Sequence, residues 1–522
     1  MHKGMIIRKN EYHDSVFLMR VAKRISEQEG ILQAVLFMGT EKNKGFLAEI
    51  GFTAGELAPA SPGDLILAVE ATMPEILTDV LKNMDGWLQA EPGSGTAADV
   101  RSLDEALTRL PQVNLAVISV PGSYAAREAQ QALERGLNVF IFSDNVPVES
   151  ERTLKEYARE RGLIVMGPDC GTAIVGGIGI GFANVVRRGP VGVIGASGTG
   201  IQEFTCLVHQ AGSGISQAIG IGSRDLSDAL GGISLLCALT ALEKDNRTET
   251  IALLSKPPGP LALSNLLPKI LQCRKPVVVC FLGGKKEPVP PDRLFQQART
   301  IDEAAALAVR NVQGQFPPDF SSAAGGLDVL VSRERRAMSP SQRYVRGIFA
   351  GGTFCYQAQQ IFNDAGLAVY SNAPIAENLR LSDPLQSEEH SLVDMGADEF
   401  TVGRPHPMID SRQRRERLLA EAKDPMVAGI LLDFLLGFNS AADPVGELAP
   451  AIAEAKGEFK KRGGFLSVVA SVCGTDGDPQ SLCEQIARLE AEGVVVLPSS
   501  ARAARFAAML ALQLKGGFSD VR

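Results

Sequence analysis

Short apolar runs alternate with segments of helical spacing along most of the chain. An apolar run of four to eight residues predicts a buried strand, and apolar residues three and four apart predict an amphipathic helix. Alternating strands and helices are typical of α/β sheets covered by helices. We therefore predict several Rossmann-like and flavodoxin-like doubly wound domains. In the first ninety residues, the pattern predicts a parallel or mixed sheet.

The most distinctive stretch joins a strand to a helix through glycines: Val191-Gly-Val-Ile-Gly-Ala-Ser-Gly-Thr-Gly-Ile-Gln-Glu. We call Gly195–Gly200 the first glycine turn. A second glycine turn, Ala350–Thr353, lies in Gly347-Ile-Phe-Ala-Gly-Gly-Thr-Phe. The two turns and the Ala-Gly pairs that end both following helices have the same separation in the chain. A repeated spacing of this kind indicates an internal duplication.

The duplication and the changes in composition predict five segments. Residues 1–100 form an N-terminal α/β domain, and residues 101–188 form a Rossmann domain. Residues 189–315 and 344–522 contain the two copies of the repeat. Residues 316–343 are rich in glycine, serine and arginine, and we predict an interdomain linker there. Within the second copy, residues 376–411 have no counterpart in the first.

Both glycine turns have the chemistry of an anion site. Glycine lets the backbone approach a ligand closely, and the start of a helix offers unpaired N–H groups and the positive end of its dipole. The first glycine turn continues Ile-Gln rather than Lys-Ser, and it lacks G-x-G-x-x-G spacing, so neither a Walker loop nor a dinucleotide fingerprint is predicted. The alternative is a tight turn without a ligand. The duplication favours two facing turns that bind one small anion, through Ser197, Gly198, Thr199, Gly200, Gly351, Gly352 and Thr353.

Several other polar residues stand at predicted strand ends or on stiff loops. Arg224, Asp225 and Lys256 follow predicted strands of the first copy and could bind a carboxylate or phosphate, or form surface ion pairs. His406 lies between two prolines beside Arg404, on a loop that is either functional or merely exposed. The remaining candidates form a proline-fixed and glycine-fixed loop that could contact a cofactor: Asp169, Cys170 and Thr172.

Composition narrows the classes of partner. The net charge is −8 and no long basic run occurs, so nucleic acid is not an expected partner. No apolar run reaches membrane-spanning length and no apolar signal core follows the first methionine, so we expect a cytoplasmic protein without a membrane contact. Eight scattered cysteines without a C-x-x-C pair predict reduced thiols, and no metal-ligand spacing is present.

These motifs carry a family resemblance over nearly the whole chain. Residues 138–172, ending in Gly-Pro-Asp-Cys-Gly-Thr, resemble the CoA-binding domain of the succinyl-CoA synthetase α-subunit. Residues 189–232 resemble its ligase domain, and residues 344–515 resemble the carboxy-terminal ligase domain of the β-subunit. The order of the parts, with Ser255-Lys-Pro-Pro and Val402-Gly-Arg-Pro-His-Pro-Met-Ile-Asp, closely resembles the FdrA family of acyl-CoA synthetase-like proteins.

The chain also departs from the synthetases. In their α-subunit a catalytic histidine follows the strand that matches Pro276–Leu282, but here that loop reads Gly283-Gly-Lys-Lys-Glu-Pro-Val-Pro-Pro-Asp. No histidine occurs between His209 and His390. The ATP-grasp domain of the β-subunit has no counterpart either. A phosphohistidine relay from ATP is therefore not expected on this chain.

The FdrA resemblance implies a subunit of oxamate carbamoyltransferase in anaerobic allantoin degradation, working with operon-encoded partner proteins. That reaction converts oxalurate and phosphate into oxamate and carbamoyl phosphate, and it requires no cofactor. We hypothesise that the glycine turns bind the phosphate, that Arg224, Lys256 or Arg404 anchors the carboxylate, and that His406 assists proton transfer. Two alternatives stay open: an acyl-CoA synthetase that uses a separate ATP-grasp chain, and a non-catalytic assembly subunit. CoA could bind at the loops 120–123 and 143–145.

Overall fold

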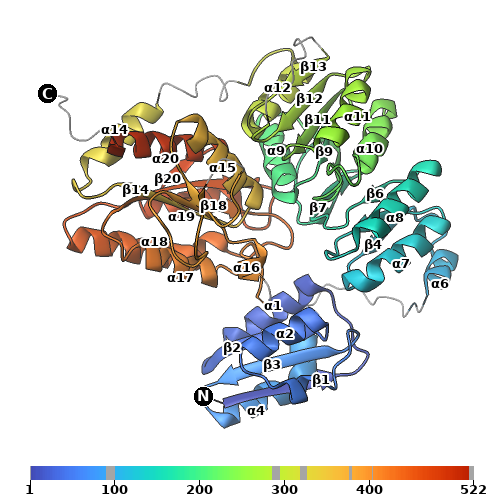
Figure 1. Ribbon diagram of the computed structural model, residues 1–522, viewed down its shortest axis with the longest axis horizontal. Coiled ribbons are helices and arrows are strands. Elements are labelled where there is room, and N and C mark those ends of the chain that lie inside the picture. The colour runs from blue at the N-terminus through green and yellow to red at the C-terminus, as the bar shows by residue number, and fades with distance from the viewer. Residues whose placement is uncertain are drawn as a thin grey trace. The chain divides into compact units, whose positions relative to one another are not determined.

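The computed structural model describes residues 2–89, 100, 102–284, 294–317, 326–375, 379–401 and 404–515. The chain divides into two compact units, which are described separately below. The first unit is Met1–Pro168 together with Thr401–Pro405, and the second is Asp169–Phe400 together with His406–Arg522. Figure 1 shows their helices and strands.

The N-terminal sheet of the first unit has three strands in the order β1-β3-β2, and both pairs are antiparallel. The prediction of a parallel or mixed sheet was therefore wrong. Alternating periodicity fixes the order of strands in the chain, but it does not fix which strands become neighbours, and here β3 inserts between the other two. Helices cover both faces of this sheet. The elements are β1 (His2–Arg8), α1 (Ser15–Ser26), β2 (Ile31–Met38), α2 (Glu41–Glu49), α3 (Ala54–Leu57), β3 (Leu65–Ala71), α4 (Pro74–Lys82) and α5 (Met84–Leu88).

The second sheet of the first unit is a parallel one in the order β4-β5-β6, as the βαβ pattern predicts. Small side chains such as Ala125, Ala129 and Ala132 let a helix pack closely on it. Its elements are α6 (Leu103–Arg109), β4 (Leu115–Ile118), α7 (Gly122–Glu134), β5 (Asn138–Ile141), α8 (Val148–Glu160) and β6 (Val165–Met166).

The next hairpin does not belong to this sheet. Strands β7 (Thr172–Val175) and β8 (Ile178–Gly181) pair with each other, and β7 continues onto β10 of the second unit. The end of the predicted domain 101–188 thus lies in the second unit, which begins at Asp169. Because β7 forms only after the Gly-Pro turn at 167–168, sequence periodicity alone could not assign it to either sheet.

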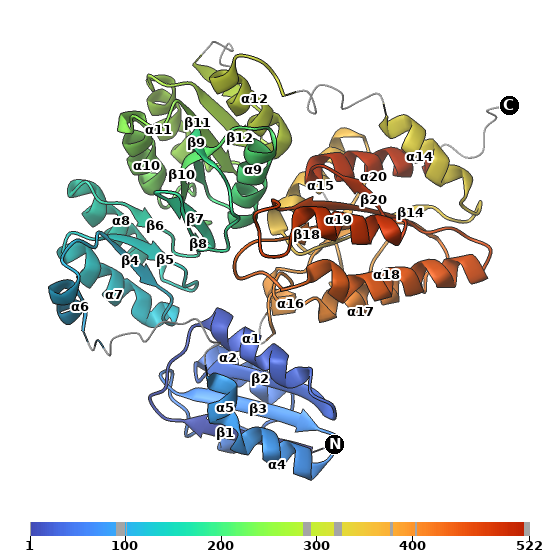
Figure 2. The same ribbon diagram turned by 180° about the vertical axis from the view of Figure 1, so that it is seen from behind.

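The second unit contains two lobes, each built on a seven-stranded sheet. In the first lobe (169–317) the strand order is β13-β12-β11-β9-β10-β7-β8. Figures 1 and 2 show α9 and α12 on one face of the sheet and α10 and α11 on the other. The further elements are β9 (Arg188–Gly195), α9 (Gly198–Gln210), β10 (Ile215–Gly220), α10 (Ile233–Lys244), β11 (Thr250–Ser255), α11 (Pro260–Leu271), β12 (Val277–Phe281), β13 (Phe295–Gln297) and α12 (Ile301–Gln313).

In the second lobe (326–515) the strand order is β16-β15-β17-β14-β18-β19-β20. Helices α14, α15 and α20 pack on one face, and α17, α18 and α19 pack on the other. The elements are α14 (Leu327–Arg336), β14 (Tyr344–Phe349), α15 (Gly352–Asp364), β15 (Tyr370–Ser371), β16 (Leu379–Arg380), β17 (Ser391–Asp394), α16 (Asp398–Thr401), α17 (Arg412–Glu421), β18 (Val427–Leu435), α18 (Pro444–Lys461), β19 (Ser467–Cys473), α19 (Leu482–Ala491), β20 (Val495–Leu497) and α20 (Ser500–Lys515).

The two lobes share one topology, which confirms the internal duplication. Five strands follow the same parallel order in both, β10-β9-β11-β12-β13 in the first and β17-β14-β18-β19-β20 in the second. This is the flavodoxin-like order, in which ligands bind beside the first strand where the direction of the connections reverses. Strands β9 and β14 occupy that position, and each runs into one of the glycine turns. Residues 376–411, predicted to have no counterpart in the first copy, contribute β17 next to β14, where the first lobe has β10 next to β9, so the prediction was wrong for this strand.

The predicted linker 316–343 is largely structured. Helix α14 lies within it, and residues 318–325 fall outside the described residues. Leu327, Val331 and Met338 are buried in the core beneath α20. The arginines that suggested a linker occupy the last turn of α14, where positive side chains suit the negative end of the helix dipole.

Candidate functional site

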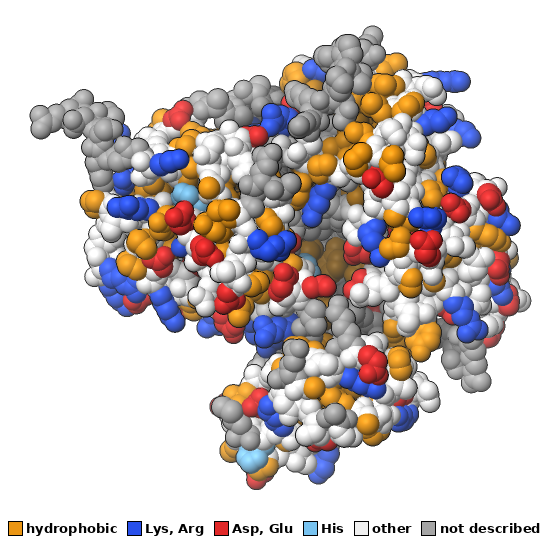
Figure 3. Space-filling model, in the orientation of Figure 1, with side chains coloured by type: hydrophobic (Ala, Val, Ile, Leu, Met, Phe, Trp, Pro, Cys, Tyr) orange, Lys and Arg blue, Asp and Glu red, His pale blue; other side chains and the backbone are white. Residues whose placement is uncertain are grey.

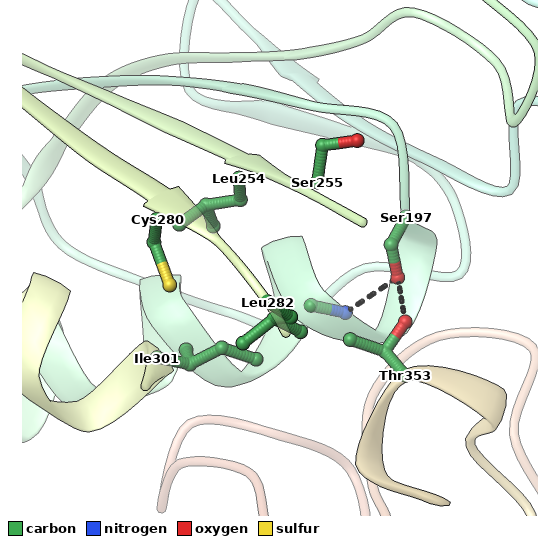
Figure 4. A pocket seen from close by; sticks show the side chains of 8 residues that line it. Ser197, Leu254, Ser255, Cys280, Leu282, Ile301 and Thr353 are labelled. Carbon is green, nitrogen blue, oxygen red and sulfur yellow. Dashed lines mark hydrogen bonds between the residues drawn. The ribbon is translucent and has the colours of Figure 1, made fainter. Parts of the chain in front are cut away.

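The two glycine turns meet, as the duplication predicts. Ser197 is the N-cap of α9, and its Oγ accepts a hydrogen bond from Gly200 N at 3.1 Å. The same Oγ is hydrogen-bonded to Oγ1 of Thr353 in the first turn of α15. Figure 4 shows the two hydroxyl groups pointing toward one another. An anion that binds both hydroxyls must therefore replace this direct bond.

A small pocket opens beside the hydroxyl pair. Leu254, Leu282 and Ile301 form much of its wall, and Cys280 Sγ points into it (Figure 4). Burial raises the pKa of the Cys280 thiol far above its ordinary value, so this thiol is not a nucleophile at neutral pH. The complete lining is Ser197, Gly200, Leu254, Ser255, Cys280, Leu282, Ile301 and Thr353.

A buried hydroxyl lies at the start of α9. Thr172 is 1% exposed, and its Oγ1 has no hydrogen-bond partner among the described residues. That oxygen lies 3.0 Å from the position a Cβ on Gly198 would take. Of the other two loop candidates, Cys170 is buried with its thiol against Gly220, and Asp169 is exposed with a φ of 57°. Thr172 is therefore the loop residue that faces the helix start.

The start of α15 contains a carboxylate instead. Asp433, in β18, accepts hydrogen bonds from Ala350 N at 2.8 Å and from Gly351 N at 2.7 Å. The buried guanidinium of Arg414 donates to the same carboxylate at 2.9 Å. Burial raises the pKa of Asp433, and these three donors oppose that shift. The two helix starts thus differ, because among the described residues only the start of α15 has a carboxylate that accepts its backbone N–H groups.

Lys256 extends from the first lobe toward the second. It directly follows β11, and its Nζ lies 5.0 Å from the centre of the Tyr356 ring on α15. Nearby, Asp394 ends β17. Burial raises the pKa of Asp394 to about 6, although Gly396 N and the positive charge of Lys256 both lower it. Of the three cations predicted to anchor a carboxylate, Lys256 is the one that these interactions place beside the glycine turns.

His406 lies close to Asp394, beside Gly396. Its Nδ1 accepts a hydrogen bond from Met408 N at 3.2 Å, which leaves the ring proton on Nε2. Burial and the nearby Arg414 lower the pKa of His406 to about 4, so the ring is neutral at pH 7. Its Nε2 and Asp394 Oδ1 lie 2.8 and 3.2 Å from the position a Cβ on Gly396 would take. The predicted proton-transfer residue is thus close to a carboxylate that stands at the start of α15.

Three further predicted site residues are Asp225, Arg224 and Arg404. Asp225 is fully buried and accepts hydrogen bonds from Ser234 N and Leu235 N, both at 3.0 Å. It caps the start of α10, so its carboxylate is not directed at a ligand, which corrects the prediction. Arg224 is partly buried in the preceding loop. Arg404 is exposed and groups with the first unit.

Sequence reasoning missed a third buried acid, Glu203, at the centre of α9. Its carboxylate accepts hydrogen bonds from Ser500 N at 2.6 Å and Ser500 Oγ at 2.7 Å. Burial raises the pKa of Glu203 to about 7. A signal existed in the sequence, because Ile201 and Phe204 flank a charged residue within an otherwise apolar helix. For Asp394 and Asp433, the signal was an acid at the end of a buried strand.

Comparisons with known proteins match both ends of the chain. A family model described as CoA-ligase matches residues 348–510, and one described as AllF, heavy metal-associated domain, matches residues 1–102. The protein YahF of Escherichia coli (strain K12) is 43% identical over 501 residues, which are 96% of this chain and 97% of YahF. The α-subunit of the ADP-forming succinate–CoA ligase of Methanothermobacter thermautotrophicus is 29% identical over 219 residues, 41% of this chain and 72% of that one.

Among solved structures, ATP citrate lyase from Methanothrix soehngenii in complex with citrate and coenzyme A is similar over 80% of this chain and 85% of that one. The sequence identity is 14% and the TM-score is 0.34. Within the described residues, no helix is long and apolar enough to cross a membrane.

The match of the N-terminal segment to a heavy metal-associated domain raises the question of a metal. Soft heavy metals bind to thiolates, but the first cysteine of the chain is Cys170, beyond the matched segment. No group of three or more histidine, cysteine, aspartate or glutamate side chains that could hold a metal occurs in the described part of the chain. The residues of this domain do not fit a heavy-metal site.

The long match to YahF decides the family. It runs over nearly the full length of both chains, and the CoA-ligase model covers the second lobe. The α/β fold with parallel sheets, the duplicated flavodoxin-like lobes and the paired glycine turns agree with it. The chain belongs to the family of YahF, the FdrA-like, succinyl-CoA synthetase-like proteins.

Proposed function

We propose that this protein is a subunit of an oxamate carbamoyltransferase in anaerobic allantoin degradation. It interconverts oxalurate plus phosphate with oxamate plus carbamoyl phosphate, in the cytoplasm and with operon-encoded partner proteins. The observation that carries the proposal is the meeting of two helix starts, α9 and α15, at Ser197 and Thr353. Helix starts bind phosphate groups, and both the substrate and the product of this reaction contain one.

The phosphate group binds at the start of α9. Here Gly198 and Thr199 stand in the first helical turn, whose N–H groups have no carbonyl partner within the helix, and Thr172 adds a buried hydroxyl. At the start of α15, Asp433 already accepts the N–H groups of Ala350 and Gly351 and would repel a second anion. Thr353 reaches across from α15 and takes part through its hydroxyl.

The rest of the substrate extends from the phosphate toward the second lobe. Lys256 stands between the two lobes, above Tyr356, and its ammonium group binds the carboxylate shared by oxamate and oxalurate. Holding both ends of the substrates brings nitrogen and carbonyl carbon together, and direct transfer then needs no covalent enzyme intermediate and no cofactor. The backbone N–H groups of the first glycine turn stabilise the negative charge that develops on the carbonyl oxygen.

The decisive experiment supplies oxamate and carbamoyl phosphate to the full chain, alone and with its operon-encoded partners. We expect oxalurate and free phosphate to form in equal amounts, without ATP or CoA. The same mixtures with ATP, CoA and a short-chain dicarboxylate test for thioester formation. Neither product, with a stable complex of the partners, would identify an assembly subunit and overturn the proposal.

One observation favours the second candidate, an acyl-CoA synthetase that uses a separate ATP-grasp chain. The CoA-ligase model matches residues 348–510, and a succinate–CoA ligase α-subunit is a relative over 219 residues of the chain. Against it stands the sequence, in which the loop after β12 has no histidine to carry a phosphoryl group. Thioester formation in the ATP and CoA mixture, without oxalurate in the other, would establish this candidate instead.

The variant Thr172→Val tests the phosphate position. Valine keeps the shape of threonine but removes a hydroxyl that can donate to the bound anion, and a hydrogen bond to a charged group contributes about 1.5–3 kcal/mol. We expect the Kd for inorganic phosphate, measured by calorimetric titration, to rise about tenfold or more. An unchanged Kd would exclude Thr172 from the site.

The matched control is Thr240→Val. Thr240 is exposed on α10, where its hydroxyl donates to Leu236 O at 2.8 Å. Thr240→Val makes the same chemical change away from both glycine turns, so we expect its Kd for inorganic phosphate to equal that of the unaltered protein. A double variant, Thr199→Ala with Thr353→Ala, should weaken phosphate binding further, because it removes a hydroxyl from each helix start.

A further inference from the structure

We infer that Asp394 is the residue that moves the proton at the substrate nitrogen, and that His406 is a positioning residue for it. This inference rests on the proposed function, since it names the group that the carbamoyl transfer needs in addition to the binding residues. It also changes the role that the sequence suggested for His406.

The geometry at the start of α15 places Asp394 at the site. Its Oδ2 lies 2.6 Å from the position a Cβ on Gly352 would take, so the carboxyl group packs directly against the first residue of the helix. Only glycine at position 352 leaves room for the Asp394 carboxyl group there. Gly352 is adjacent to Thr353, whose hydroxyl bonds to Ser197 of the facing turn. The carboxyl group therefore stands beside the point where the two lobes meet.

At the start of α9, which faces α15, one buried hydroxyl indicates a ligand. Thr172 Oγ1 is buried and unpartnered at the start of α9. With the phosphate group held there, the transferred carbonyl carbon and the substrate nitrogen extend toward α15. Asp394 is the acid that such a nitrogen reaches, since Asp433 is already occupied by three donors: Ala350 N, Gly351 N and Arg414 Nη2.

Two hydrogen bonds fix the position of Asp394. Gly396 N donates to its Oδ1 at 2.9 Å, and Asn372 Oδ1 accepts from its backbone N at 2.9 Å. His406 Nε2 lies on the same side of Gly396 as Asp394 Oδ1, 2.8 Å from the position a Cβ on Gly396 would take, and His406 Nδ1 accepts a hydrogen bond from Met408 N. The imidazole thus packs against Gly396, whose N–H orients the carboxyl group, and this contact gives His406 its positioning role.

The charges around Asp394 suit a group that gains and loses a proton near neutral pH. Lys256, from the first lobe, favours the carboxylate form, while Asp433 and Glu399 favour the acid form. Arg414 forms an ion pair with Asp433 at 2.9 Å, and His406 is neutral. Burial outweighs these charges and raises the pKa of Asp394 to about 6. A catalytic base is most effective when its pKa is close to the working pH.

The proton balance of the step is complete without a further reactant. In the direction of oxalurate, the amide nitrogen of oxamate attacks the carbonyl carbon of carbamoyl phosphate, and the bond from that carbon to the phosphate oxygen breaks. The nitrogen loses one proton to the Asp394 carboxylate, and Asp394 passes it to the departing phosphate. In the opposite direction, phosphate gives its proton to Asp394, which protonates the departing nitrogen.

The test is the variant Asp394→Asn, assayed for oxalurate formation in the complete assembly with its partners. Asparagine can still accept from Gly396 N but cannot take up a proton. We expect kcat to fall by about 100-fold or more, with the KM for carbamoyl phosphate changed by less than about threefold. The unaltered protein should gain rate as the pH rises through about 6, because the carboxylate form is the base, and the variant should lack that rise.

Further variants distinguish the role of Asp394 in proton transfer from the positioning role of His406. Glu399→Gln removes an exposed charge near Asp394 and should keep kcat within twofold. His406→Gln should lower kcat less than Asp394→Asn and shift the pH at which the rate rises, without abolishing that rise. If Asp394→Asn does not fold, Gly352→Ala displaces the carboxyl group while leaving it present, and it should give the same loss of kcat.

The outcomes separate this inference from the proposed function. An unaltered assembly that forms no oxalurate overturns the proposed function and this inference with it. An active assembly in which Asp394→Asn retains kcat within a few-fold and the same pH profile overturns the role of Asp394 alone. An equal loss of kcat and of the pH-dependent rise in His406→Gln would reverse the two assignments.

Discussion

Replacing Asp433 with alanine is expected to destabilise the second lobe by about 3–5 kcal/mol, because the change leaves a buried charge without its partner. Arg414 is almost fully buried and is paired with Asp433 at 2.9 Å. The N–H groups of Ala350 and Gly351 lose their acceptor at the same time. Urea unfolding of the variant should show the loss as a lower midpoint in the transition of the second unit.

A double-mutant cycle controls this experiment. Arg414→Met removes the charge that Asp433→Ala would strand, so the double variant should be more stable than Asp433→Ala alone. Asp433→Asn keeps an acceptor for Ala350 N and should lose less stability than the alanine variant. Equal stability of Asp433→Ala and the unaltered protein would show that this ion pair does not hold the start of α15 in place.

The unfolding free energy should also depend on pH through Glu203. Burial raises its pKa from an ordinary value of 4.5 to about 7, so between these values the folded state keeps a proton that the unfolded state has lost. The resulting stability is fully present below about pH 4.5 and disappears as the pH rises through about 7. The shift corresponds to about 3 kcal/mol, at 1.36 kcal/mol for each pKa unit.

The measurement compares Glu203→Gln with the unaltered protein at several pH values. Glutamine has the same shape and does not titrate, so the difference in unfolding free energy between the two proteins should change steadily between about pH 4.5 and 7. Taking the difference removes the pH dependence that other groups contribute to both proteins. Such groups include His390 and His406, whose pKa values burial lowers to about 4. A difference that stays constant with pH would contradict the assignment to Glu203.

Much of the fold could be predicted from local patterns. The repeated glycine turns and the helix stops after them specify two copies of one unit, because each feature is encoded by neighbouring residues. The N-terminal sheet could not be predicted in the same way. Its direction depends on β3 inserting between β1 and β2, which is a choice of partner rather than of local structure.

The residues of the candidate site also fall into those that local patterns predict and those that depend on strand order. Ser197 and Thr353 could be found because the duplication places both at helix starts. Asp394 and Asp433 lie near the start of α15 because their strands, β17 and β18, flank β14 in the sheet. No spacing in the sequence encodes that strand order. Asp225 shows the converse, since it stands at a strand end as predicted but caps a helix whose start follows eight residues later.

Charged side chains of both signs are interspersed over the face shown in Figure 3. On this face, a small anion finds no single basic surface to follow, in accord with the net charge of −8. In the proposed function, the attraction for a phosphate group comes from local groups, namely backbone N–H dipoles and one lysine. Such short-range attraction is less sensitive to added salt than a long-range field.

The bond between Ser197 and Thr353 joins the two lobes within one polypeptide. Two separate chains would form the same contact only in proportion to their concentrations, whereas here each half of the site is always supplied with the other. The effective concentration of one helix start at the other is set by the chain and not by expression level. Dilution should therefore not separate the halves, and the partner proteins of the proposed assembly would meet a site that is already formed.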